Sequence, residues 1–222
     1  MNLREWVEEP NYAVRADLHI HPLAHKYYGN CDDLRDIILD EKDKKKIRKV
    51  IDWCIKVRGL GAIALTDHDM IQSSLYAAEH VKKQKLDIEI ITGAECEVTD
   101  PEARISSMPI HLLCLGIKEL PAYTRRTAVD KMIRLVHEMG GKAIMAHPIY
   151  YPETFCRYAY LLDGYEYENG GAGMAFTFGM SFLKTRVFDH KIKYYCNSDF
   201  HYELFLPRQP DELLCNEGWE GL

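Results

Sequence analysis

The chain has 222 residues with a formal net charge of −6, and 47% of its residues are hydrophobic. This length favours one large domain over two small ones, and the apolar share is sufficient for a sizeable core. An acidic chain has no general attraction for nucleic acid or for an anionic membrane surface, and no segment has the long uncharged apolar run of a membrane span.

The seven cysteines are scattered without CxxC pairs. This distribution predicts reduced, mostly buried thiols instead of a disulfide framework or a zinc ribbon. Residues 1–6 lack the basic-then-apolar order of a signal peptide, so we expect a cytoplasmic protein.

The first predicted strand covers residues 13–18 and continues into alternating polar side chains before Pro22 ends it. Successive side chains of a strand point to opposite faces, so Asp17, His19 and His21 share one face. Two imidazoles at this spacing can bind one metal ion, and the carboxylate below them can accept the second ring N–H. The competing interpretation is a strand whose polar face meets solvent.

The next stretch combines a loop with helical patterns. His25 in the loop is either a further ligand or a solvated histidine. Asp32 or Asp33 is predicted to cap a helix that runs to about Leu39. Apolar residues at helical spacing then predict a second helix over residues 42–58.

Two short apolar strands, at residues 62–65 and 88–91, lead into further clusters. The first runs into Asp67 and His68, and the second ends shortly before Glu95. A carboxylate suits a position between two metal ions, because each of its oxygens can bind one. Amphipathic patterns predict three more helices, over residues 70–85, 121–139 and 177–188.

Four more strands are expected, over residues 110–115, 142–145, 163–169 and 193–196. His111 lies at the start of the first of these and is either a ligand or a satisfied core histidine. His147 follows the second. Asp199 and His201 follow the last, and their spacing places them on one face, as in the first cluster.

Seven apolar strands alternating with helical stretches predict an α/β fold with a mainly parallel sheet or barrel. Six of these strands end at, or contain, a histidine or an acid. In α/β barrels, sites gather at the mouth formed by the carboxyl ends of the strands. Imidazole and carboxylate ligands suit Zn, Mn or Fe, and these ligand types do not identify which metal binds.

The motifs DLHIH, TDHD, GAE, HLLCLG, AHP and SDFH, in this order along residues 13–201, resemble the PHP family, named for its polymerase and histidinol phosphatase members. The resemblance implies a distorted (β/α)7 barrel whose metal site lies at the C-terminal mouth of the strands. It also implies phosphoester hydrolysis with two or three divalent ions. Residues 1–222 would form a single PHP-type domain, with a core at about 13–201 and a C-terminal extension at 202–222.

Matched by position, the resemblance implies that Glu95 bridges two metal ions. His68 and His201 would hold a third ion in members that have one. Many family members place an Asp or His five or six residues after the HxH motif to complete the third site. This chain has Tyr27 at six residues, and His25, at four residues, is the best substitute. Asp17 and Asp67 would support the ligands from behind. The candidate catalytic residues are Asp199, His68 and His25. The implied metal ligands are His19, His21, His68, Glu95, His111, His147, Asp199 and His201.

The predicted function is hydrolysis of a small-molecule phosphate monoester, or a nucleotide-type phosphoester, by a hydroxide that bridges the metal ions. The expected partner is a phosphorylated small molecule, with no nucleic acid and no membrane. Two alternatives stay open, a nuclease that acts on DNA or RNA ends and a non-catalytic, metal-binding regulatory module. The sequence singles out no substrate-binding residue.

Overall fold

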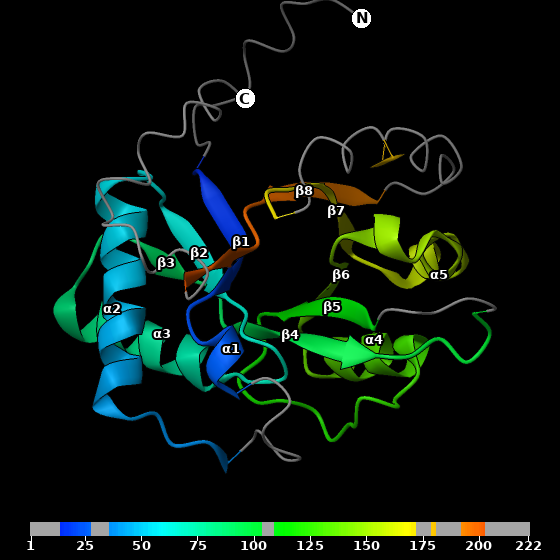
Figure 1. Ribbon diagram of the computed structural model, residues 1–222, viewed down its shortest axis with the longest axis horizontal. Coiled ribbons are helices and arrows are strands. Elements are labelled where there is room, and N and C mark those ends of the chain that lie inside the picture. The colour runs from blue at the N-terminus through cyan, green and yellow to red at the C-terminus, as the bar shows by residue number, and fades with distance from the viewer. Residues whose placement is uncertain (1–13, 28–35, 104–108, 172–178, 181–191, 203–222) are drawn as a thin grey trace, which may run out of the picture.

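The computed structural model describes residues 14–27, 36–103, 109–171, 179–180 and 192–202 (Figure 1). The described strands form two sheets. The first has four parallel strands in the order β3 (Glu89–Ile90), β2 (Ala62–Leu65), β1 (Ala16–His21) and β9 (Phe200–His201).

The second sheet has five strands in the order β4 (Gly93–Val98), β5 (Ile110–Leu115), β6 (Lys142–Met145), β7 (Gly164–Asn169) and β8 (Lys193–Asn197). Strand β5 is antiparallel to both of its neighbours, whereas β6, β7 and β8 are parallel. The described part of the link between β4 and β5 contains no crossover helix, which a parallel return normally requires.

The two edge strands of the second sheet, β8 and β4, contact the inner strands of the first sheet, β1 and β2. At one edge, the Leu18 amide donates to Asn197 Oδ1 at 3.0 Å, and the Ser198 amide donates to Asp17 Oδ1 at 3.1 Å. At the other edge, the Glu95 amide donates to the carbonyl of residue 66 at 3.2 Å. The α/β class is therefore confirmed, but the described strands do not show the continuous, closed (β/α)7 barrel that was predicted.

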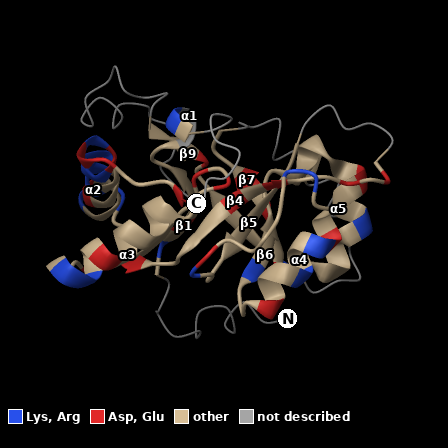
Figure 2. Ribbon diagram, turned by 90° about the horizontal axis from the view of Figure 1, so that it is seen from below, with Lys and Arg blue, Asp and Glu red and all other residues tan. Residues whose placement is uncertain are grey.

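Helices cover the outer faces of both sheets, with α2 (Glu41–Lys56) and α3 (Gln72–Gln84) beside the first and α4 (Val129–Glu138) and α5 (Pro152–Tyr158) beside the second (Figure 1). Charged residues lie along these helices, while the strands between them are mainly uncharged (Figure 2). Three one-turn segments complete the described elements: α1 (Ala24–Tyr27), η3 (Pro148–Tyr150) and η4 (Ala159–Leu161).

A small apolar cluster is formed by side chains from strands of both sheets. Leu18 of β1, Leu113 of β5 and Ile144 of β6 are among its members, and each is almost fully buried. Burying such side chains contributes about 1.5–3 kcal/mol each relative to exposure. The packing of this cluster therefore fixes the strands that end in the polar residues described below.

Strands 62–65, 110–115 and 142–145 are confirmed with the bounds that the sequence predicts. The helix predicted over 121–139 is wrong in its start, because it begins at Val129, whose amide bonds the Thr99 carbonyl at 2.9 Å. Helix α5 was not predicted. Nearly all of the predicted helix 177–188 and the first half of the predicted 32–39 helix lie outside the described residues, and residues 37–39 are not helical.

No described helix is both long and apolar enough to cross a membrane. Residues 203–222, which hold nearly all of the predicted C-terminal extension, lie outside the described part of the chain.

Candidate metal centre

Five imidazoles surround one buried carboxylate, that of Glu95 in β4. Their nearest ring nitrogens lie 2.9–3.4 Å from a Glu95 oxygen. Three of them approach Oε1 and two approach Oε2, so each oxygen faces a separate group of rings. The five are His19, His21, His68, His111 and His147.

Asp199 supplies a second carboxylate to the same cluster. Its Oδ1 lies 3.3 Å from both His19 Nε2 and His21 Nε2, and 3.5 Å from His201 Nδ1. The structure therefore brings together all eight side chains that the family resemblance implies as ligands. The metal-ligand role of these side chains remains a prediction.

Strand register explains why residues far apart in sequence meet. His21 of β1 is paired directly with His201 of β9, and their ring centroids lie 4.3 Å apart. His111 is the second residue of β5, and because β5 is antiparallel to β6, it lies just beyond the carboxyl end of β6. The Ala146 amide bonds the His111 carbonyl at 3.2 Å, which places His111 beside His147.

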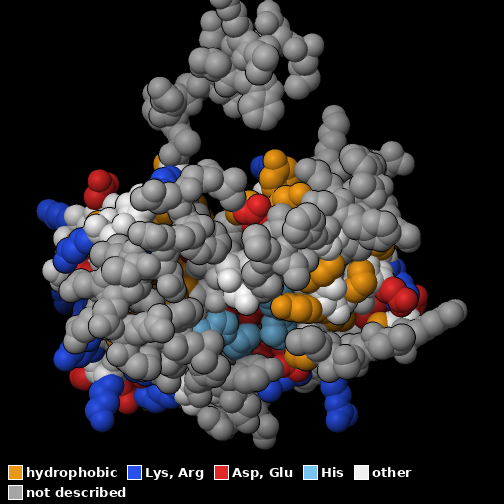
Figure 3. Space-filling view, turned by 45° about the horizontal axis from the view of Figure 1, so that its top comes forward, with side chains coloured by type: hydrophobic (Ala, Val, Ile, Leu, Met, Phe, Trp, Pro, Cys, Tyr) orange, Lys and Arg blue, Asp and Glu red, His pale blue; other side chains and the backbone are white. Residues whose placement is uncertain are grey.

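The cluster is layered from a buried floor to a partly exposed rim. The side chains of His19 and His21 are 0% exposed and that of Glu95 is 1% exposed. The rim side chains, which are 11–18% exposed, are those of His68, His111, His147, Asp199 and His201. A pocket of about 180 Å³ opens onto them, and histidines are visible in a hollow of the face shown in Figure 3.

Several buried ring nitrogens of the floor and rim suit a bound cation. Among the described residues, His19 Nε2, both ring nitrogens of His21 and both of His111 are buried without a well-directed hydrogen bond. Buried polar groups in native proteins are normally satisfied, and exceptions require an explanation. Each of four overlapping groups places three ligand atoms within 4.8 Å of one another: His19–His21–Glu95, His19–His147–Asp199, His68–Glu95–His111 and His21–His68–His201.

Hydrogen bonds on the far side of two rings orient their free nitrogen toward the cluster. His19 Nδ1 lies 2.8 Å from Glu166 Oε1, and His147 Nδ1 lies 3.1 Å from the Tyr151 hydroxyl. That hydroxyl donates to the Ala146 carbonyl, so it accepts from His147 Nδ1–H. Both rings then present an Nε2 lone pair, which is the atom a metal ion requires.

The electrostatic environment favours ionised carboxylates in the cluster. Burial opposes ionisation of Glu95, but His111, His19 and His68 lower its pKa well below the ordinary range. Burial likewise opposes ionisation of Asp199, yet the pKa of that carboxyl is lowered by His19 and His21. Burial lowers the pKa of His21, which favours the neutral imidazole. Burial opposes protonation of His19 and His111 too, but neighbouring carboxylates raise the pKa of both, through Asp199, Glu166 and Glu95 for His19 and through Glu95 for His111. Metals bind ionised carboxylates and neutral imidazoles, so an ion bound here would displace protons from these two rings.

Glu166 is the functional candidate that sequence reasoning missed. It is fully buried in β7, and the strand's Tyr-Glu-Tyr-Glu alternation gives no sign of which acid faces inward. Asp17 differs from its predicted role, because it accepts backbone N–H groups of His19 and Ser198 and no ring N–H. The carboxylate that accepts the His19 ring proton is Glu166.

Two other predicted residues lie behind or beside the cluster. Asp67 accepts the Leu23 amide at 2.8 Å, and burial raises its pKa to about 7, so it supports the loop after β1. The Tyr27 hydroxyl donates a hydrogen bond to Asp43 Oδ2 at 2.7 Å, so this side chain contacts helix α2. The side chain of His25 lies outside the described part of the chain.

Two predicted ligands have a strained backbone. Four described non-glycine residues lie in the left-handed region, Asp69, Lys85, His147 and Asp199, with φ values of 52°, 53°, 27° and 51°. Lys85 ends helix α3, where this conformation is common. Elsewhere it is costly for side-chain-bearing residues and collects at functional sites, and here His147 and Asp199 are predicted ligands.

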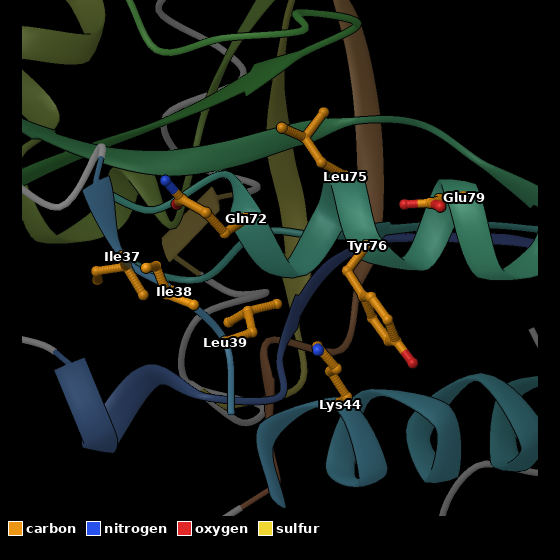
Figure 4. Close-up of a pocket in the computed structure, with 8 residues that line it drawn as sticks. All are labelled: Ile37, Ile38, Leu39, Lys44, Gln72, Leu75, Tyr76 and Glu79. Atoms are coloured by element: carbon orange, nitrogen blue, oxygen red, sulfur yellow. The ribbon is translucent and has the colours of Figure 1, made fainter. Parts of the chain in front are cut away.

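A larger depression, of about 350 Å³, lies between α2, α3 and residues 37–39 (Figure 4). Leu75 and Tyr76 of α3 line one side, and Lys44 of α2 faces them. No histidine is among the described residues that line it, so we place the chemistry in the smaller pocket.

The profile of the PHP domain family matches residues 37–181, about two thirds of the chain. The chain belongs to the PHP family. The matched region contains His68, Glu95, His111 and His147, whereas the HxH and SDxH motifs flank it.

Solved structures show the same fold. An amidohydrolase from Chromobacterium violaceum, determined with bound sulfate and no metal, superposes with a TM-score of 0.57 at 16% identity, covering 84% of this chain and 87% of that one. A candidate metal-dependent phosphoesterase from Bifidobacterium adolescentis gives a TM-score of 0.56 at 15% identity, covering 85% and 88%. No curated protein sequence matches the chain.

Proposed function

We propose that this chain is a metal-dependent phosphoesterase that hydrolyses a small-molecule phosphate monoester. One observation carries the proposal: buried imidazole nitrogens without well-directed hydrogen bonds converge on the ionised Glu95 carboxylate, at the floor of an open pocket. Membership of the PHP family and the likeness to a candidate phosphoesterase support it.

The overlapping ligand groups could hold two or three divalent ions of Zn, Mn or Fe, with Glu95 shared between ions. When bound, such ions supply Lewis acidity and lower the pKa of coordinated water. The two carboxylates hold negative charge at the floor, and the neutral His21 ring adds a ligand without adding charge.

We infer that rim residues handle the leaving group. His68 and His201 line the pocket and are partly exposed, so either can transfer a proton to a leaving oxygen. The pocket has roughly the volume of six liquid water molecules, which suits a phosphate with a small alcohol. Tyr150, half exposed at the mouth, borders the space for that alcohol.

The test combines metal content with turnover. Protein purified without chelator should contain two or three metal ions per chain and hydrolyse p-nitrophenyl phosphate faster with added Mn. His19→Ala should lose metal and activity together. His80→Ala, in helix α3 and outside the cluster, is the matched control and should keep both.

Three outcomes would contradict the proposal. Fewer than one metal ion per chain, with no turnover after reconstitution, would show that the proposed metal centre does not form. Metal without turnover on a panel of phosphate monoesters would favour the binding module. Hydrolysis confined to oligonucleotides, with salt-sensitive binding, would favour the nuclease.

A further inference from the structure

We propose that Glu166 is a positioning residue that fixes His19 in the tautomer required for metal binding and holds the His147 backbone in its strained conformation. The inference rests on the proposed metal centre, but it does not depend on which substrate the protein hydrolyses.

The Glu166 carboxylate is fully buried and accepts four hydrogen bonds. Its Oε1 lies 2.8 Å from His19 Nδ1 and 2.9 Å from Asn197 Nδ2. Its Oε2 lies 2.9 Å from both the His147 amide and Asn169 Nδ2. An ionised carboxylate has about four lone-pair sites, so this set of donors saturates it.

The bond to His19 determines which ring nitrogen can bind a metal ion. A saturated, ionised carboxylate only accepts hydrogen bonds, so His19 must carry its proton on Nδ1. Nε2 is then the atom left to bind an ion, and it faces Glu95 Oε1 at 3.2 Å and Asp199 Oδ1 at 3.3 Å, oxygens with which it could share that ion. With the proton on Nε2, His19 could not act as a ligand in this orientation.

The same carboxylate couples three predicted ligands from separate strands. Its bond to the His147 amide restrains a residue whose φ is 27°. Asn169, held by Glu166 Oε2, also donates to Asp199 Oδ2 at 3.2 Å. His19, His147 and Asp199 form one of the groups able to hold a metal ion, so Glu166 supports every member of that group.

Glu166→Gln is the first test. An amide has one acceptor oxygen and one donor nitrogen, so one pair of the four donors would face an N–H group. We expect metal affinity to fall about 10–100-fold, as is typical when a partner of a ligating histidine is lost. The readout is competition between metal-free protein and a chromophoric chelator. Glu168→Gln, on the same strand and outside this hydrogen-bond set, is the control and should bind metal as the wild type does.

The double variant Glu166→Gln/Asn197→Asp separates positioning from general structural support. The carboxylate introduced at position 197 can accept from the new amide and still accept the Leu18 amide, as Asn197 Oδ1 does at 3.0 Å. The new amide oxygen can serve the His147 and Asn169 donors. Its nitrogen then donates to His19 Nδ1, which moves the His19 proton to Nε2. Net charge is unchanged, and every donor again meets an acceptor.

We therefore expect the metal-free double variant to recover thermal stability toward the wild type while its metal affinity stays low. Nitrogen-15 NMR of labelled histidine should report Nδ1–H with a metal-bound Nε2 for His19 in the zinc-loaded wild type, and Nε2–H in the double variant. The inference is wrong if Glu166→Gln binds metal as tightly as the wild type, or if the double variant recovers affinity together with stability. If the wild type binds no metal at all, the proposed function itself fails.

Discussion

Replacing Glu95 by Gln should remove most of the stabilisation that this protein gains from metal ions. The carboxylate is 1% exposed and lies 2.9–3.4 Å from five imidazoles. It belongs to two of the four predicted ligand groups and contacts histidines of the other two. A neutral amide of the same size keeps the packing but removes the anionic carboxylate that we propose would be shared between ions. The perturbation is therefore specific to cation binding.

The expected magnitude follows from linkage. A ligand present at 100 times its dissociation constant stabilises the folded state by about 2.7 kcal/mol. For a chain of this size, 1 kcal/mol shifts the melting temperature by about 2–4 °C, so saturating metal should raise that of the wild type by about 5–11 °C. If the variant binds about 100-fold more weakly, the same metal concentration stabilises it by only about 0.4 kcal/mol, which corresponds to a shift of about 1–2 °C.

The assay is thermal unfolding by scanning calorimetry across a metal series, beginning from chelator-treated protein. Glu79→Gln, an exposed carboxylate of helix α3, is the matched control and should retain the full shift. An equal metal-dependent shift in Glu95→Gln and the wild type would refute the reasoning, as would a wild type whose melting temperature does not respond to metal.

Two further predictions concern the surroundings of the site and the outer surface. Tyr151→Phe leaves His147 Nδ1–H without its acceptor, so metal affinity should fall about 10-fold with the fold retained by circular dichroism; unchanged affinity would exclude this role. Burial opposes ionisation of Asp163, but bonds from Lys142, the Ala143 amide and His137 lower its pKa below the ordinary 3.8. Its contribution, roughly 1 kcal/mol, is therefore present above pH ~4 and is lost as pH falls through the lower folded-state pKa. In urea unfolding, Asp163→Asn should be less stable than the wild type at pH 7, and the difference should shrink toward pH 3; a difference that grows on acidification would contradict this.

The sequence predicts the short central strands well because their patterns are locally complete. Residues 62–65 and 142–145 are nearly all apolar, each segment follows a glycine, and both strands have the predicted limits. The spacing of His19 and His21 also predicts that both side chains lie on one face, since alternation is a property of the strand itself. Helix α4 is less predictable, because residues 122–128 form turns joined to Thr99 of a distant segment.

Sequence by itself determined which chemistry this chain can contain: histidines and carboxylates at strand ends, in an order that matches the PHP family. Only the tertiary structure decided how they meet. The antiparallel direction of β5 places His111 beside His147, and the parallel pairing of β1 with β9 places His21 beside His201. Glu166 joins His19 across 147 residues of chain, a contact that no local pattern encodes, because strand order and direction depend on burial across the whole fold.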